Sequence, residues 1–111
     1  MNLNTRSEGN VLVVECNLES IDASNVRQFR STMQSVLAEH KNAVLDMSHI
    51  TFVDSSGLGA LIACMRELNG RSGDFRLAGM NRAVRALFEL MRMHKVFSIH
   101  DTVEGAVASF A

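Results

Sequence analysis

The sequence of 111 residues contains no proline, tryptophan or tyrosine, only two cysteines, and almost no excess of either charge. The absence of the first three residue types excludes no class of function. Cys16 and Cys64 are isolated, so the pattern argues against a disulfide framework, and both thiols are expected to be buried and inert. The formal net charge is −1 and lysine and arginine form no cluster, which argues against a nucleic-acid groove.

Long hydrophobic runs are also missing. The first ten residues, MNLNTRSEGN, lack the apolar segment of a signal peptide. No apolar run approaches the roughly 20 residues that span a bilayer. We therefore expect a cytoplasmic protein that does not bind a membrane. Apolar residues make up 47% of the chain, enough for one core, and the length suits one domain over residues 1–111 without a linker or a repeat.

The spacing of apolar residues alternates between the period of strands and the period of helices. Gly9-Asn10 suits a hairpin turn between two apolar segments. Strands are predicted before this turn and at 11–16, 43–47, 75–79 and 96–99, and helices at 24–40, 54–69, 81–91 and 101–110. Asn81 is the expected cap of the third helix, and Asp101 with Glu104 has capping-box spacing before the fourth. The order β-β-α-β-α-β-α-β-α predicts an α/β domain with about four helices and a mostly parallel central sheet of about five strands.

The segment FVDSSGLGAL (52–61) joins a strand to the second helix. Ligands and partners of open α/β sheets tend to meet such loops, at the carboxyl ends of strands. Asp54 or Ser55 can accept a hydrogen bond from a free amide of the first helical turn. Gly57 and Gly59 are expected to let the backbone turn sharply and to expose those amides. On one interpretation this loop is nothing more than a well-capped helix start.

Motifs for enzymatic or ligand-binding chemistry are incomplete in this loop. The phosphate-binding pattern G-x-x-x-x-G-K-[ST] is absent, and GLGALI supplies only half of G-x-G-x-x-G. Serine hydrolases carry their nucleophile on G-x-S-x-G with a histidine base, but here the serines follow Asp54. No metal-ligand spacing occurs, so we expect no cofactor. Four histidines are expected at the surface or at element ends: His40, His49, His94 and His100.

Phosphorylation is the remaining chemistry of a serine at an exposed helix N-terminus. The added charge of about −1.5 to −2 would lie against the positive end of the helix. The phosphate is expected to use the amides of Ser56, Gly57 and Leu58, whereas Asp54 opposes it by like-charge repulsion. Because these effects roughly offset, modification is expected to change the surface presented to a partner and not the fold.

Three segments in this order resemble the STAS domains of bacterial anti-sigma factor antagonists. They are IDASN (21–25), AVLDMSHITFVDSSGLGAL (43–61) and VRALFELMRMHKVFSIHDTVEGAV (84–107). The resemblance implies a single STAS-like domain with a partner-switching role in transcription regulation. It implies that Ser55, the first hydroxyl residue after the motif aspartate, is phosphorylated.

The resemblance also implies the partners. The unphosphorylated protein would bind an anti-sigma factor that is a serine kinase, which frees the sigma factor. Phosphorylation of Ser55 would end this interaction, and a PP2C-type phosphatase would restore it. ATP and magnesium would belong to these partners, so the domain itself would be no enzyme and a monomer when free.

The binding face implied by the resemblance comprises Asp22, Ser24, Asp54, Ser55, Ser56, Gly57, Leu58 and Gly59. Asp22 and Ser24 are equally explained as a cap of the first helix. Family members commonly carry glycine shortly before the first aspartate, whereas this chain has Glu19 and Ser20. One rival function is a non-switching STAS subunit of a transporter complex, for example in lipid transport, with Ser55 only a cap. Another is a small enzyme with Ser55 as its nucleophile.

Overall fold

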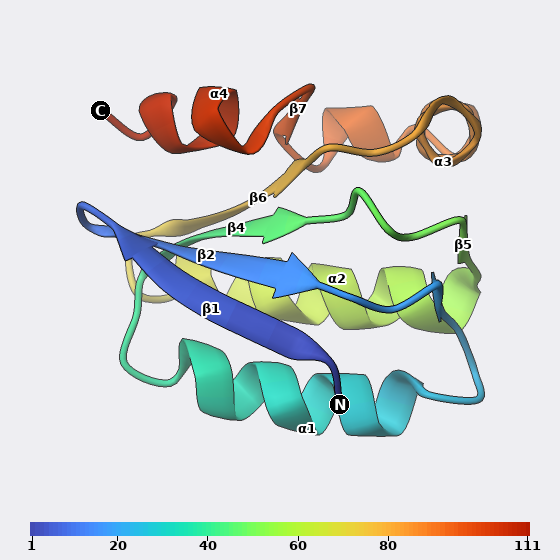
Figure 1. Ribbon diagram of the computed structural model, residues 1–111, viewed down its shortest axis with the longest axis horizontal. Coiled ribbons are helices and arrows are strands. Elements are labelled where there is room, and N and C mark those ends of the chain that lie inside the picture. The colour runs from blue at the N-terminus through green and yellow to red at the C-terminus, as the bar shows by residue number, and fades with distance from the viewer.

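The computed structural model describes residues 1–111, and a five-stranded sheet forms the middle layer of the protein (Figure 1). The strands lie in the order β1-β2-β4-β6-β7. The first pair is antiparallel and every other pair is parallel. The predicted α/β class with a mostly parallel sheet is therefore confirmed. The bounds are Leu3–Glu8 (β1), Val11–Cys16 (β2), Asn42–Asp46 (β4), Asp74–Ala78 (β6) and Ile99–His100 (β7).

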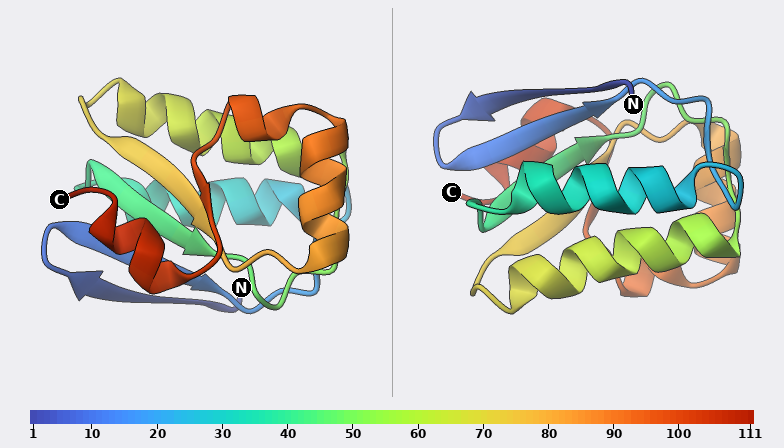
Figure 2. Two further views of the ribbon diagram at one scale, coloured as in Figure 1. Left: turned by 90° about the horizontal axis from the view of Figure 1, so that it is seen from above. Right: turned by 90° about the horizontal axis from the view of Figure 1, so that it is seen from below.

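The structure has the four helices that the sequence predicts. Helices α1 (Val26–Leu37) and α2 (Ser55–Asn69) lie side by side against one face, and α4 (Val103–Ala108) lies on the other (Figures 1 and 2). Helix α3 (Arg82–Leu90) lies at one end of the molecule, and its Val84 and Phe88 join the same core as α1 and α2. None of these helices combines the length with the apolar character that crossing a membrane requires.

Alternation along the strands divides the buried residues between the two faces. On β4, Ala43 and Leu45 join the main core, where Phe29 and Met33 of α1 pack, while Val44 belongs to a small cluster under α4. This follows from the two-residue period of a strand, which points successive side chains to opposite faces. The central strands are thus buried on both sides, as their continuous apolar runs predict.

The hairpin between β1 and β2 is confirmed. Glu8 pairs with Val11, so Gly9 and Asn10 form a two-residue turn. Gly9 adopts a φ of +63°, a conformation that glycine reaches without the steric cost of a Cβ atom.

The last predicted strand is confirmed as β7, but it lies at Ile99–His100 and not at 96–99, because the chain first forms a turn. A 3-10 helix, η1 (Met93–Lys95), is followed by Val96 and Phe97, whose amides both donate to the carbonyl oxygen of Met93. The ring of Phe97 is 3% exposed and lies 6.4 Å from that of Phe88 between centroids. Phe97 is thus buried from within this turn, and the pairing of the chain with β6 begins only at Ile99 of β7.

The helix starts were predicted with mixed success. Asn81 caps α3 as predicted, because its Oδ1 accepts from the amide of Val84 at 2.8 Å. Asp101 does not cap α4; the hydroxyl of Thr102 accepts from the amide of Gly105 at 3.0 Å. Asp101 instead forms an ion pair with Arg85 at 3.2 Å. The Asp101 side chain is 94% exposed, so this ion pair contributes little to stability.

The ends of the first two helices also differ in detail from the prediction. Helix α1 begins at Val26 and ends at Leu37, two or three residues inside the predicted 24–40. Helix α2 ends at Asn69 as predicted, but Gly70 stays in the right-handed region, and the left-handed residue is Ser72 with a φ of 65°.

A second, two-stranded sheet was not predicted, and it positions the two loops of interest. Strands β3 (Ser20–Ile21) and β5 (Phe52–Val53) pair in parallel, with Ser20 opposite Phe52. The amide of Thr51 donates to the carbonyl oxygen of Glu19 at 2.7 Å and extends this pairing. The loops that follow β3 and β5 consequently leave the sheet together, at the right of Figure 1.

Gly57 is required for a close approach and not, as expected, for a sharp turn. Gly57 and Gly59 both lie within α2, and neither has a positive φ. A Cβ atom on Gly57 would overlap the carbonyl oxygen of Ile21 and lie 2.9 Å from Cγ1 of Val53. A Cβ atom on Gly59 would meet nothing within 4 Å. The first turn of α2 therefore packs directly against the backbone of β3.

These two glycines provide a matched test of this contact. We expect Gly57→Ala to lower the free energy of unfolding by about 1–3 kcal/mol, the usual cost of overpacking. Gly59→Ala is expected to raise it by up to about 1 kcal/mol, because alanine is the better helix former. Urea denaturation of both variants measures the difference, and equal stabilities would contradict the close packing of α2 on β3.

Candidate functional site

The carboxylate of Asp54 joins the two loops that follow β3 and β5. Asp54 occupies the N-cap position of α2, and its Oδ1 accepts from the amide of Gly57 at 2.9 Å. Its Oδ2 accepts from the amide of Ala23, in the other loop, at 3.0 Å. The backbone adds a bond from the amide of Asp54 to the carbonyl oxygen of Ile21 at 3.3 Å. One side chain thus caps a helix and fixes a loop that is 31 residues away in sequence.

Asp22 organises the first loop from within. Its Oδ2 accepts from the hydroxyl of Ser20 at 2.8 Å, and its Oδ1 accepts from both the amide and the hydroxyl of Ser24. Its main-chain oxygen accepts from the amides of Asn25 and Val26 at the start of α1. Ser20, one of the two residues in place of the expected glycine, therefore takes part in the loop as a hydrogen-bond donor.

These bonds to Asp22 favour its charged form. The hydroxyl of Ser24, then the hydroxyl of Ser20 and the amide of Ser24, lower the pKa of the Asp22 carboxyl below its ordinary value. A carboxyl with a lowered folded-state pKa stabilises the fold above its unfolded pKa. Its contribution is lost as the pH falls through the lower, folded-state value, so the loop is fully organised at neutral pH.

Asn25 is a structural residue of this site that the sequence did not single out. It occupies the N-cap position of α1, yet its side chain makes no capping bond there. Its Oδ1 accepts from the amide of Asp22 at 3.0 Å, and its Nδ2 donates to the carbonyl oxygen of Ser20 at 2.8 Å. The cap predicted for Asp22 and Ser24 is thus a loop network that includes Asn25. A polar residue at the first helix start was the available signal.

Ser55 is the exposed member of the serine pair. It is the first residue of α2, and its hydroxyl makes no hydrogen bond within the protein, whereas Ser56 is half-buried. The amides of Gly57 and Leu58 are occupied by Asp54, through Oδ1 and the main-chain oxygen. An added anion would therefore find only the amides of Ser55 and Ser56 free, which corrects the expectation that Gly57 and Leu58 would serve it.

The remaining residues of the predicted binding face differ in accessibility. Asp22 and Asp54 are partly exposed, and Ser24 and Gly59 are exposed. Gly57 is buried, and Leu58 is 7% exposed and belongs to the main core. The structure thus brings the Asp22 and Asp54 loops together at one end of the molecule, and contact of any of these residues with a partner stays a prediction.

Phe52 adds an apolar side chain that the sequence had not marked as part of this face. It is 51% exposed, although it lies on β5 beside the buried Val53. Because side chains alternate along a strand, Phe52 projects away from the core, and Asp54 follows it by two residues. Its partner across the small sheet is Ser20. The signal in the sequence was this two-residue spacing from Asp54.

The arrangement offers little support for catalysis by Ser55. No histidine is hydrogen-bonded to Ser55; the one serine–histidine pair joins Ser98 to His100 at 2.8 Å, on and next to β7. No three His, Cys, Asp or Glu side chains come together where they could hold a metal ion. Burial raises the pKa of the Cys16 thiol to about 11 and that of Cys64 to about 12, so neither thiol is reactive at neutral pH.

Comparison with known proteins identifies the architecture. The family model of the STAS domain matches residues 2–106. The anti-sigma F factor antagonist of Paenibacillus polymyxa is 29% identical over 80 residues, which cover 72% of this chain and 67% of that protein.

Solved structures show the same fold at lower identity. An anti-sigma factor antagonist from Mycobacterium paratuberculosis is 24% identical and superposes with a TM-score of 0.85, over 97% of this chain and 92% of that one. The phosphorylated form of the Bacillus cell fate determinant SpoIIAA is 19% identical, with a TM-score of 0.70 over 99% and 100%. At these identities the likeness establishes the fold alone.

Two substitutions of Asp54 compare the loss of one of its side-chain hydrogen bonds, to Gly57 or to Ala23, with the loss of both. Asparagine keeps one acceptor oxygen and caps helices well, so Asp54→Asn retains one of the two bonds and should cost about 1 kcal/mol of unfolding free energy. Asp54→Ala removes both bonds and should cost about 2 kcal/mol. Denaturant titration gives both values. If Asp54→Asn were as stable as the original protein, the bond to Ala23 would contribute nothing.

Proposed function

The chain belongs to the STAS domain family, and from this premise we propose that it is an anti-sigma factor antagonist switched by phosphorylation of Ser55. The unphosphorylated protein binds an anti-sigma factor that is also a serine kinase, and so releases the sigma factor or other target. Phosphorylation of Ser55 ends the binding, and a PP2C-type phosphatase resets the protein. The domain itself carries out no reaction.

The free hydroxyl of Ser55 is the observation that carries this proposal. Ser55 is exposed at the first position of α2, outside the network that engages Asp22, Ser24 and Asp54. A kinase can reach this hydroxyl without breaking a hydrogen bond of the protein. No general base contacts it, which favours the role of phosphoacceptor over that of nucleophile.

Electrostatics at this position suit a switch that masks a surface. The α2 N-terminus stabilises a nearby anion by about 0.3–1 kcal/mol, and two free amides can bind the phosphate. The carboxylates of Asp54 and Asp22 oppose it with a Coulomb repulsion of the same order at an exposed site. With so small a net effect, the phosphate has little reason to move the fold. A partner that covers Ser55 must instead desolvate the new charge.

The surroundings of Ser55 fit a protein-binding face. Phe52 offers a half-exposed aromatic ring beside the two loops, and buried aromatic side chains commonly dominate binding energy at protein interfaces. The loops themselves are held by Asp54 and by the network around Asp22. A face fixed in this way loses little conformational entropy on binding.

The first test locates the modified atom. Each anti-sigma kinase of the host is incubated with the protein, ATP and magnesium, and intact mass is measured. We expect one added phosphate on the original protein and on Ser56→Ala, and none on Ser55→Ala. A phosphate placed on Ser56 by tandem mass spectrometry would overturn the assignment.

The second test concerns affinity for that kinase. Ser55→Asp should weaken binding by roughly 3 kcal/mol or more, because an unpaired charge buried in an interface costs about 3–5 kcal/mol. Ser55→Ala should bind about as well as the original protein. Ser7→Asp, which adds the same charge at an exposed position of β1, is the matched control and should bind normally. Calorimetry showing equal binding by Ser55→Asp and Ser55→Ala would favour a non-switching STAS subunit of a transporter complex.

A further inference from the structure

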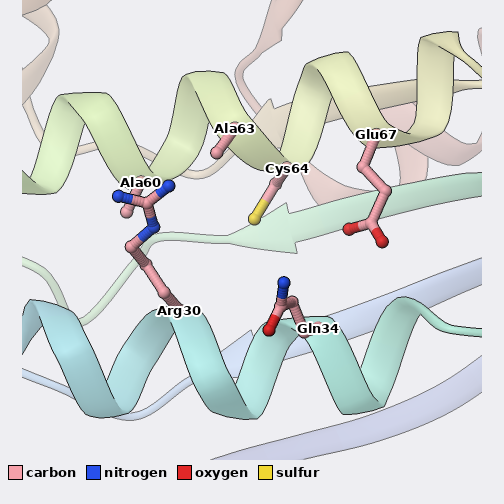
Figure 3. Close-up of a pocket in the computed structure, with 6 residues that line it drawn as sticks. All are labelled: Arg30, Gln34, Ala60, Ala63, Cys64 and Glu67. Carbon is pink, nitrogen blue, oxygen red and sulfur yellow. The ribbon is translucent and has the colours of Figure 1, made fainter.

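A polar groove runs between α1 and α2, away from the loops described above. It has a volume of about 220 Å³. Figure 3 shows side chains from both helices converging on it. The lining residues are Arg30, Gln34, Ala60, Ala63, Cys64 and Glu67.

The groove exists because α2 presents small side chains to α1 at this level. The larger residues of α1 and α2 pack against the sheet. On the side away from the sheet, space is left between the two helices by the small side chains of Ala60, Ala63 and Cys64. Helix α1 contributes Arg30 and Gln34, which are four residues apart and so lie on the same face of the helix. The result is an apolar floor with polar side chains along its rim.

Two of the three polar side chains on this rim, those of the exposed residues Arg30 and Gln34, have no partner within the protein. The ion-pairing arginines are Arg6, Arg71, Arg76 and Arg85, and Arg30 is not among them. Neither the Arg30 guanidinium nor the Gln34 amide makes a hydrogen bond, although Figure 3 shows both directed toward α2. Arg30 is therefore a free cation at one end of the groove.

The opposite end of the groove carries a carboxylate held in place. Oε1 of Glu67 accepts from Arg71 at 2.8 Å, which leaves Oε2 free. The guanidinium of Arg71 also donates to the carbonyl oxygens of Leu37, the last residue of α1, and of His40, three residues beyond it. Arg71 thus orients Glu67 while much of its own hydrogen-bonding capacity is used at α1.

Helix direction gives the groove the same polarity as these two side chains. Both α1 and α2 return between parallel strands, so they run in the same direction. Glu67 lies in the last turn of α2, where the helix end is partly negative, and Arg30 lies nearer the positive N-terminal ends. The groove therefore offers a cation at Arg30 and, at its other end, the free Oε2 of a carboxylate whose charge Arg71 partly offsets.

The separation of the two charges sets the kind of molecule that fits. Figure 3 shows the Arg30 guanidinium beside Ala60, and Glu67 is seven residues further along α2, about 10 Å at 1.5 Å per residue. An ion pair takes up about 3 Å at each end, so about 4 Å remains between the charged groups of a ligand. The charged groups of an α-amino acid are closer together than this.

From this geometry we propose that the α1–α2 groove binds a short ω-amino acid, with its carboxylate on Arg30 and its ammonium group on Glu67. The Gln34 amide, whose nitrogen faces α2 in Figure 3, turns over so that its oxygen accepts a second bond from the ammonium group, and the methylene chain lies over Ala60, Ala63 and Cys64. The groove is smaller than the roughly 300–1,000 Å³ of sites for drug-sized ligands, which restricts the occupant to a small molecule. This site is independent of the function proposed for Ser55.

A chain-length series tests the proposal directly. Glycine, β-alanine, 4-aminobutyrate, 5-aminopentanoate and 6-aminohexanoate are titrated into ¹⁵N-labelled protein, and amide NMR shifts are followed. We expect saturable shifts in the groove segments of α1 and α2, with the tightest binding at an intermediate chain length. Butyrate and butylamine, which each carry a single charge, should bind at least about fivefold more weakly, because each loses one exposed ion pair.

Matched variants complete this test. We expect at least about fivefold weaker binding of the best ligand by Arg30→Gln and by Glu67→Gln. This factor corresponds to the loss of one exposed ion pair of about 1 kcal/mol. Arg27→Gln removes an exposed cation of α1 that does not line the groove, and it should bind normally. Arg30 makes no bond in the folded protein, so its substitution should leave folding intact. Absence of groove shifts, equal binding of butyrate, no dependence on chain length, or unchanged binding by Arg30→Gln would each overturn the proposal.

Discussion

The carboxylate of Asp54 determines the form of the candidate binding face, because each of its oxygens serves a different segment. One oxygen caps α2 at Gly57, and the other holds the amide of Ala23 in the loop before α1. The two segments can share one carboxylate only because β3 and β5 pair beneath them and because Gly57 has no side chain to keep α2 away from Ile21. Packing and hydrogen bonding therefore act on the same few residues.

This network leaves Ser55 outside it, which matters for regulation. The hydroxyl is exposed and unbonded, while its neighbours on both loops are engaged. A modification at Ser55 would add charge to a surface that is already fixed. The proposed switch depends on this separation between the residues that maintain the loops and the residue that changes.

The α1–α2 layer combines stability with accessible polar groups in a similar way. Its lower part, with Phe29, Met33 and Leu61, is fully buried against the sheet. Its upper part keeps a groove, because small residues of α2 face Arg30 and Gln34 there. In the two proposals the same pair of helices serves at different levels, with its N-terminal end for a protein partner and its middle for a small zwitterion.

Periodicity in the sequence determined the main elements, since apolar spacing directly reflects which face of a helix or strand is buried. It predicted the order of the helices and sheet strands. Residue types that favour turns and caps predicted the Gly9-Asn10 hairpin and the Asn81 cap. The Asp-Ser-Ser motif likewise placed Asp54 at the cap and Ser55 at the start of α2.

Tertiary structure alone decided the features that depend on contacts between distant residues. The pairing of β3 with β5 and the bond from Ala23 to Asp54 each join segments about 30 residues apart, and two-residue strands are too short to show a period. Phe97 lies in a turn and is nevertheless buried, and Asp101 pairs with Arg85 instead of capping α4. Gly57 allows a close approach between α2 and β3 instead of forming a turn. In each case the role of the residue depends on a contact partner that only the fold brings near it. The local sequence therefore does not predict that partner.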